Sequence, residues 1–107
     1  MSHILLAAAG AIFWTAAVHG QIYGDADQGS RIAHRVCSTC HVVDMRSTVA
    51  PNDGVPSFPW IARQKTLTAS ALSAFLSTSH PPMPDLVLTR DEIRQVSAYI
   101  FSLRKPD

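Results

Sequence analysis

Two cysteines and a histidine lie close together in the sequence Cys37-Ser38-Thr39-Cys40-His41. The pattern C-x-x-C-H is typical of covalent haem attachment, in which each thiol forms a thioether bond with a haem vinyl group. The spacing of Cys37 and Cys40 places both thiols on one side of the chain, and His41 then lies where it can bind the iron. The chain has no other cysteine, which excludes a framework of several disulfides. We therefore expect one haem c with its iron, attached through Cys37 and Cys40 and bound by His41.

Two other kinds of site use the same spacing of cysteines: a redox dithiol and a structural zinc site. A thioredoxin-like dithiol lies near a βαβ unit, and no segment before Cys37 has the pattern of a strand. A structural zinc site needs four Cys and His ligands, commonly in two spaced pairs. His34 and His80 do not form a second pair with the required spacing. The sequence favours haem over both alternatives.

Met83 is the predicted sixth ligand of the haem iron. A methionine sulfur opposite a histidine gives the ligand pairing that raises the reduction potential. Met83 lies between Pro82 and Pro84, and these prolines keep the segment out of a helix. One alternative is a methionine that only fills a gap in the core. Another is ligation by His80, three residues earlier, which would lower the potential, although a solvent-facing loop histidine is the more ordinary role for His80.

Apolar residues recur at helical spacing in three segments, and a short fourth helix is predicted after a proline-rich loop. No segment has a convincing strand pattern. The fold class is therefore all-α, with three main helices and a short one around one haem. Arg104 and Lys105 suit the negative end of the last helix, and Pro106 stops it. The predicted helix N-caps are, in chain order, Asp25 or Asp27, Ser57, Thr68, and Thr89 in a capping box with Glu92.

The first 20 residues are predicted to be a secretory signal peptide. The apolar run over residues 4–18 has the length of a signal-peptide core, and small residues follow it up to Gly20. The alternatives are a short membrane anchor or a buried helix, but about 20 apolar residues are needed to span a bilayer. The positive segment that usually precedes the apolar run is reduced to the amino terminus and His3. We expect cleavage after Gly20, a single domain over residues 21–107 and a periplasmic location, with membrane contact only if the segment stays uncleaved.

The charge of the chain is nearly balanced, with nine Lys and Arg against eight Asp and Glu and a formal net charge of +1. No run of one sign is present, so we do not expect binding to nucleic acid. A few basic side chains are candidates to steer an acidic partner, although a merely solvated surface is the simpler interpretation. These candidates are Arg35, Arg46, Arg63 and Lys65.

Over residues 24–103 the chain resembles the class I c-type cytochromes. The resemblance rests on the order of its segments: a helix, the C-x-x-C-H motif, the loop Pro56-Ser57-Phe58, a middle helix, the Pro-Met83-Pro loop, and a closing helix with Tyr99. Agreement across separate segments is more specific than the five-residue motif alone. The resemblance implies a cytochrome c-like fold.

The resemblance also implies roles for particular residues. The carbonyl of Pro56, which fits better than that of Pro51, would accept the Nδ1 proton of the iron-binding histidine and so fix the orientation of its ring. An early glycine and the residue four later, here Gly29 and Ala33, would cross the last helix. The family often has an aromatic residue at the second position, so Ala33 is a departure whose space Tyr99 or Phe101 would need to fill.

Trp60 has two possible roles beside such a haem. Its indole N–H can donate to a haem propionate, or its ring can pack as a core aromatic, because a buried tryptophan seeks a hydrogen-bond partner in either case.

With His41 and Met83 on the iron, no coordination site stays open for a substrate or oxygen. We therefore expect a periplasmic electron-transfer protein and not an enzyme, which carries one electron from a dehydrogenase or respiratory complex to an acceptor such as an oxidase. Redox partners of this kind meet through small, transient interfaces, and we expect a monomer. The alternatives are a haem-containing enzyme subunit or gas-binding sensor with a labile sixth ligand, and a haem-free dithiol protein.

Overall fold

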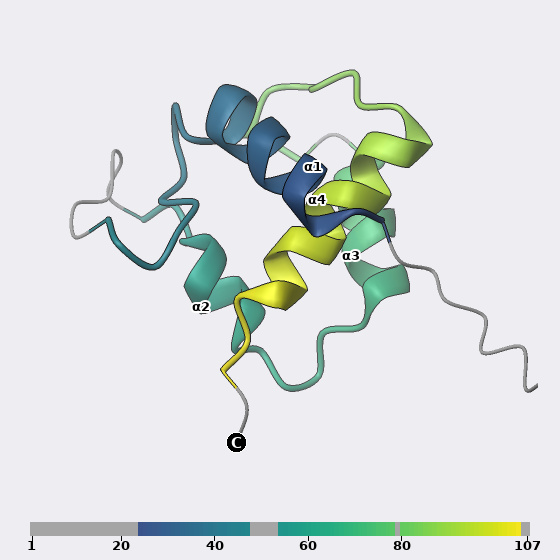
Figure 1. Ribbon diagram of the computed structural model, residues 1–107. Helices are drawn as coiled ribbons and strands as arrows, with labels where there is room; N and C mark the ends of the chain where they lie inside the picture. Colours follow the sequence, from purple (N-terminus) through teal and green to yellow (C-terminus); the bar gives the residue numbers. More distant parts are fainter. Residues whose placement is uncertain (1–23, 48–53, 79, 106–107) are drawn as a thin grey trace, which may run out of the picture.

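The computed structural model describes residues 24–47, 54–78 and 80–105. Within these ranges the chain is helical and contains no strand, so the predicted all-α class is confirmed (Figure 1). No helix in the described ranges is long and apolar enough to cross a bilayer. The predicted signal peptide, residues 1–20, lies outside them. The elements are α1 (Ala26–Ile32), a π-helical turn η1 (Ala33–Cys37) that continues it, α2 (Phe58–Ala62), α3 (Ala69–Leu76) and α4 (Arg90–Ser102).

Each α-helix begins at a side chain that caps its free backbone N–H groups, as the sequence predicted. For α1 the cap is Asp25, whose Oδ1 accepts from the N–H groups of Asp27 and Gln28 at 2.9 and 3.1 Å. The capping box of α4 is complete, because Thr89 and Glu92 each accept a hydrogen bond from the backbone of the other. Such caps satisfy N–H groups that have no partner inside the helix.

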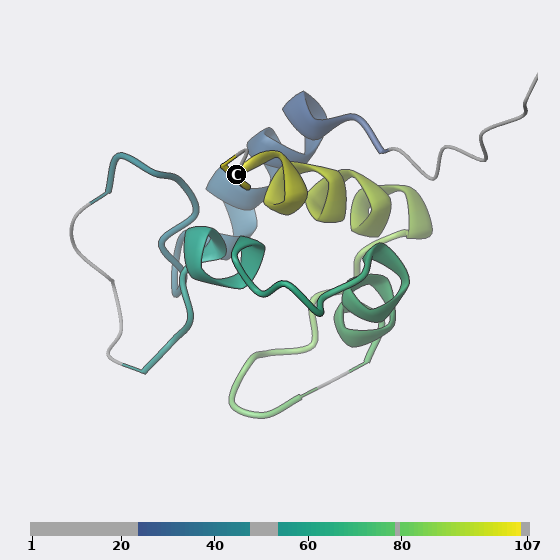
Figure 2. The same ribbon diagram turned by 90° about the horizontal axis from the view of Figure 1, so that it is seen from below.

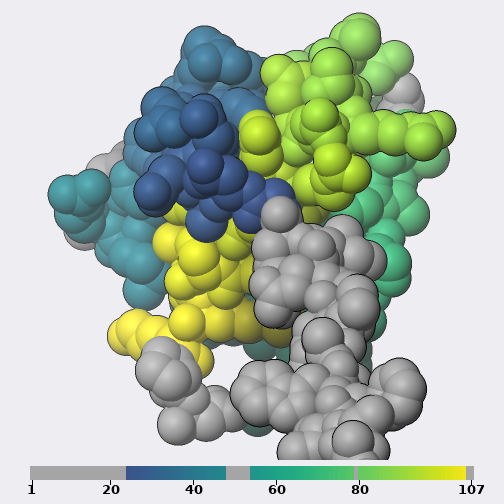
Figure 3. Space-filling view, turned by 45° about the vertical axis from the view of Figure 1, so that its right-hand side comes forward, coloured from purple at the N-terminus to yellow at the C-terminus, as the bar shows by residue number. Residues whose placement is uncertain are grey.

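Helices α1 and α4 cross in the most extensive contact between any two elements, and the space-filling view shows them in direct contact (Figure 3). Gly29 makes this possible: a Cβ atom added to it would lie 1.9 Å from the backbone oxygen of Gln95. Ala33, one turn later, is completely buried. The predicted close approach at Gly29 and Ala33 is confirmed. Gly24, which the sequence did not single out, lies similarly close to α4, because a Cβ atom added to it would be 2.3 Å from the backbone of Arg94.

Tyr99 is the aromatic side chain of α4 that is buried near this crossing, with 8 % of its surface exposed. Its hydroxyl donates to the carbonyl of Val43 at 2.8 Å, and its ring lies 6.4 Å from that of Phe58. Phe101 is only half-buried and lies under the guanidinium group of Arg104. Tyr99 therefore joins α4 to the segment that follows the cysteine motif.

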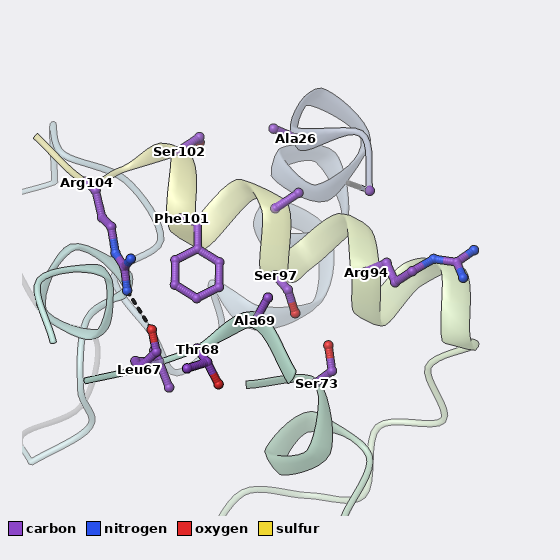
Figure 4. A pocket seen from close by; sticks show the side chains of 12 residues that line it. Ala26, Leu67, Thr68, Ala69, Ser73, Arg94, Ser97, Phe101, Ser102 and Arg104 are labelled. Carbon is purple, nitrogen blue, oxygen red and sulfur yellow. Dashed lines mark hydrogen bonds between the residues drawn. The ribbon is translucent and has the colours of Figure 1, made fainter. Parts of the chain in front are cut away.

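Arg104 lies directly after the end of α4, as predicted, and it also bonds to another part of the chain. Its guanidinium group donates to the carbonyls of Ala62 at 2.7 Å, Leu67 at 2.9 Å and Gln64 at 3.3 Å. The bond to Leu67 is drawn in Figure 4. These carbonyls lie at the last residue of α2 and in the segment that joins α2 to α3, so Arg104 links this part of the chain to the carboxyl end of α4.

Candidate functional site

A largely apolar cavity of about 710 Å³ lies inside the fold. This volume falls within the range of about 300–1,000 Å³ that is usual for ligand and cofactor sites. Figure 2 shows α4, α2, α3 and the loop after α3 arranged as a ring, and residues from each of these segments line the cavity. Its apolar lining consists mainly of Val36, Phe58, Ile61, Leu72, Phe75, Leu76, Leu86 and Ile100.

The cysteine motif forms part of the cavity wall, since Cys37, Cys40 and His41 all line it. The π-helical turn leads into the motif: the N–H of Ser38 donates to the carbonyl of Ala33, five residues earlier, at 3.0 Å. The chain then turns, and the N–H groups of Cys40 and His41 both donate to the carbonyl of Cys37. Turns of π-helix are rare and often occur at functional sites. The helical periodicity of the sequence did not predict this π-helical turn.

Cys37 is buried and Cys40 is half-buried, and the two do not form a disulfide. Burial raises the pKa of the Cys37 thiol to about 11, so it stays protonated at neutral pH. Reactive dithiols instead have a cysteine whose pKa is lowered, because the thiolate is the nucleophile. The surroundings of Cys37 therefore do not favour the alternative of a redox dithiol.

The ring of His41 is held by a backbone carbonyl. Its Nδ1 lies 2.7 Å from the carbonyl oxygen of Pro56, which is the contact that the family resemblance implied. The ring also lies beside that of Phe58, with centroids 5.5 Å apart, and the N–H of Phe58 donates to the carbonyl of Val42. With the proton on Nδ1, the lone pair of Nε2 is free to bind a metal, and such a hydrogen bond raises the basicity of a histidine ligand.

Met83 reaches the same cavity from the loop that follows α3. Its N–H donates to the carbonyl of His80 at 3.0 Å, so the backbone turns between these two residues. The neighbouring prolines Pro82 and Pro84 also line the cavity. His80 lines it too and is half-buried. The sequence-based interpretation of His80 as a solvent-facing loop residue did not include this place on the cavity wall.

Trp60 lies at the surface of α2 with 51 % of its area exposed, and it does not line the cavity. The interpretation of Trp60 as a core aromatic is wrong, and a contact with a haem propionate stays a prediction. The buried aromatic of α2 is Phe58, which is 4 % exposed. Phe58 also lines the cavity, as expected from the sequence, where it counts among the apolar residues around the haem.

A second cavity, of about 560 Å³, lies between α4 and the starts of α1 and α3 (Figure 4). Its polar lining includes the hydroxyl groups of Ser73 and Ser97, and Ser97 is 4 % exposed. No cysteine, histidine or methionine lines this cavity. In the described part of the chain, no cluster of three or more His, Cys, Asp or Glu residues is arranged to hold a metal ion. The residues expected to bind haem thus meet in the larger cavity.

Comparison with curated proteins supplies the family. The chain is 44 % identical to cytochrome c-552 of Bradyrhizobium diazoefficiens over 80 residues, which cover 75 % of this chain and 76 % of the relative. The chain is a class I c-type cytochrome. No family model matches the sequence, and no solved structure matches it.

Membership in the c-type cytochromes gives the chain the cytochrome c-like fold, a covalently bound haem c with its iron, and a role in electron transfer. The residues of the larger cavity fit this cofactor. Thiol groups are present for covalent attachment in Cys37 and Cys40, and His41 offers an imidazole whose Nε2 is free. Met83 adds a thioether, and the surrounding wall is apolar enough to exclude water from a large flat ring.

Proposed function

We propose that this cytochrome is a single-haem electron carrier of the periplasm, with the haem attached through Cys37 and Cys40. His41 and Met83 bind the iron from the two sides of the haem. The observation that supports this proposal is that one apolar cavity is lined by all four side chains. The bound haem supplies an iron that gains and loses one electron.

Three features of the chain tune the site for this role. The hydrogen bond from His41 to Pro56 holds the imidazole in one orientation and raises its basicity. The sulfur of Met83 is a soft donor that favours the reduced iron, which raises the potential. The apolar cavity wall also disfavours the added charge of the oxidised form. With both His41 and Met83 on the iron, the site would transfer electrons without binding a substrate.

Exposed basic side chains are available for contact with transient redox partners. Arg35, Arg46, Arg63 and Lys65 are all exposed and available to an acidic partner, while the net charge of +1 is too small for strong steering. We propose that a dehydrogenase or respiratory complex donates the electron, that an acceptor such as an oxidase receives it, and that residues 1–20 direct export. Trp60 would then donate to a haem propionate at the edge of the cavity.

The test uses the full chain, expressed in a bacterium that attaches haem to exported proteins. The intact mass should equal residues 21–107 plus one haem, and the haem should stay attached after denaturation. The oxidised protein should show the methionine-to-iron charge-transfer band at neutral pH, and the reduced protein should bind carbon monoxide poorly. A missing band together with ready binding of carbon monoxide would instead support a gas sensor or haem enzyme. Protein without haem would support a dithiol role.

A further inference from the structure

His80 shares with His41 the features that prepare an imidazole to bind a metal. Both side chains line the haem cavity. In each, Nδ1 lies at hydrogen-bonding distance from a backbone carbonyl: that of Pro56 for His41, at 2.7 Å, and that of Thr78 for His80, at 3.0 Å. A bond of this kind places the proton on Nδ1 and leaves a lone pair on Nε2. The Nε2 atom of His80 bonds to none of the residues that the structure describes.

The position of the His80 ring is also fixed by packing. It stacks on Phe75, with ring centroids 3.8 Å apart and an angle of 35° between the planes. Phe75 itself lines the haem cavity from α3. The ring therefore rests on a side chain of the cavity wall, although Phe75 is itself 54 % exposed.

Met83 and His80 belong to one turn of the chain, because the N–H of Met83 donates to the carbonyl of His80. A rearrangement of this turn would therefore move both side chains together and could bring His80 to the iron as Met83 leaves it. We propose that His80 is a reserve axial ligand, which binds the iron through Nε2 whenever Met83 leaves it. This inference rests on the proposed function. In this exchange the iron–sulfur bond breaks and an iron–nitrogen bond forms. The Nδ1 proton stays on the ring, and no electron is transferred.

The exchange has two consequences for the protein. First, the iron stays six-coordinate, so small molecules do not gain an open site when Met83 is released. Second, a site with two histidines has a lower potential than one with His and Met. Loss of Met83 would therefore lower the potential without turning the carrier into a haem enzyme.

His34 provides a matched control, because both of its ring nitrogens are already engaged. Its Nδ1 lies 2.9 Å from the carbonyl oxygen of Ser30, and its Nε2 lies 3.1 Å from a carboxylate oxygen of Asp44. It does not line the haem cavity. Removal of His34 should leave the iron unaffected.

The experiment compares three holoproteins: Met83→Ala, Met83→Ala with His80→Phe, and Met83→Ala with His34→Phe. Phenylalanine at position 80 keeps a ring against Phe75 but has no nitrogen. Electron paramagnetic resonance of the oxidised proteins reports the spin state, and titration with cyanide reports access to the iron. If His80 fills the site about nine-tenths of the time, cyanide binds about tenfold more weakly to Met83→Ala than to the variant that also lacks His80.

The proposal predicts low-spin iron in Met83→Ala and in the His34 control, and high-spin iron when His80 is also replaced. High-spin iron in Met83→Ala, with the same cyanide affinity as the His80 double variant, would overturn it. The single variant His80→Phe separates this result from the proposed function. It should keep the methionine charge-transfer band of the wild type, and this result would show that Met83, not His80, is the resident ligand beside His41. If replacing His80 alone opens the iron, His80 is the resident ligand and the reserve role is refuted.

Discussion

At the scale of single residues, bonds from side chains to backbone carbonyls hold the haem site in place. His41 uses the carbonyl of Pro56 and Tyr99 uses that of Val43. The Tyr99 bond is buried and joins residues far apart in the sequence. It fixes the segment directly after the C-x-x-C-H motif to the last helix. The loss of this bond should therefore weaken the fold near His41.

Tyr99→Phe tests the contribution of that bond. The variant leaves the carbonyl of Val43, a residue 4 % exposed, without its partner, which should lower the free energy of unfolding by about 1–3 kcal/mol. Denaturation of the oxidised holoprotein in guanidinium chloride measures this change as a lower midpoint with an unchanged slope. An unchanged midpoint would show that the hydroxyl contributes nothing.

The contribution of Tyr99 to the free energy of unfolding should also depend on pH. Burial raises the pKa of Tyr99 above its value in an unfolded chain. Its contribution to stability is therefore fully present below about pH 10, the unfolded pKa of tyrosine, and is lost as the pH rises through the higher pKa of the folded protein. As the pH rises from neutral to strongly alkaline, the free energy of unfolding should fall less in the Tyr99→Phe variant than in the wild type.

Local sequence signals predicted some of these residue roles and missed others. The motif singled out Cys37, Cys40 and His41, and the flanking prolines singled out Met83 as the predicted sixth ligand, because both signals are short and contiguous. All four residues line the cavity. The exposure of Trp60 and the place of His80 on the cavity wall depend on how α2 and the loop after α3 pack. Such contacts join distant parts of the chain and leave no pattern in a single segment.

At the scale of the elements, the crossing of α1 and α4 sets the frame on which the haem site is built. The helix starts were predictable, because each N-cap is a local signal of one to four residues. The close approach at Gly29 was implied by the family resemblance. The equivalent role of Gly24 and the π-helical turn were not predicted, because both follow from the fit between helices rather than from local propensity.

Gly29→Ala tests this frame. In an exposed helix, alanine stabilises by up to about 1 kcal/mol relative to glycine, but here the new Cβ would lie 1.9 Å from the backbone of Gln95. The helices must separate, so we expect a loss of about 3 kcal/mol or more in the free energy of unfolding. Gln28→Ala, at an exposed site on the same helix, is the control and should change stability by less than about 0.5 kcal/mol. Equal effects of the two substitutions would contradict the close crossing.

At the scale of the whole molecule, the haem cavity is formed by segments from nearly the full length of the domain. The motif lies on one part of its wall, Met83 lies on a loop more distant in the sequence, and α4 closes it beside Ile100. Arg104 then ties the carboxyl end of α4 to the connection between α2 and α3. The fold therefore brings two candidate axial ligands to one cofactor site, and the electron-carrier role depends on both.

The reduction potential of Met83→Ala, compared with that of the wild type, tests this role most directly. Met45, which is 48 % exposed and does not line the cavity, provides the control variant Met45→Ala. Loss of the axial sulfur should lower the potential by on the order of 0.1 V or more, within the span of roughly 0.8 V that axial ligands set, while Met45→Ala stays at the wild-type value. A potential of Met83→Ala within about 59 mV of the wild type, a tenfold change for one electron, would contradict ligation by Met83.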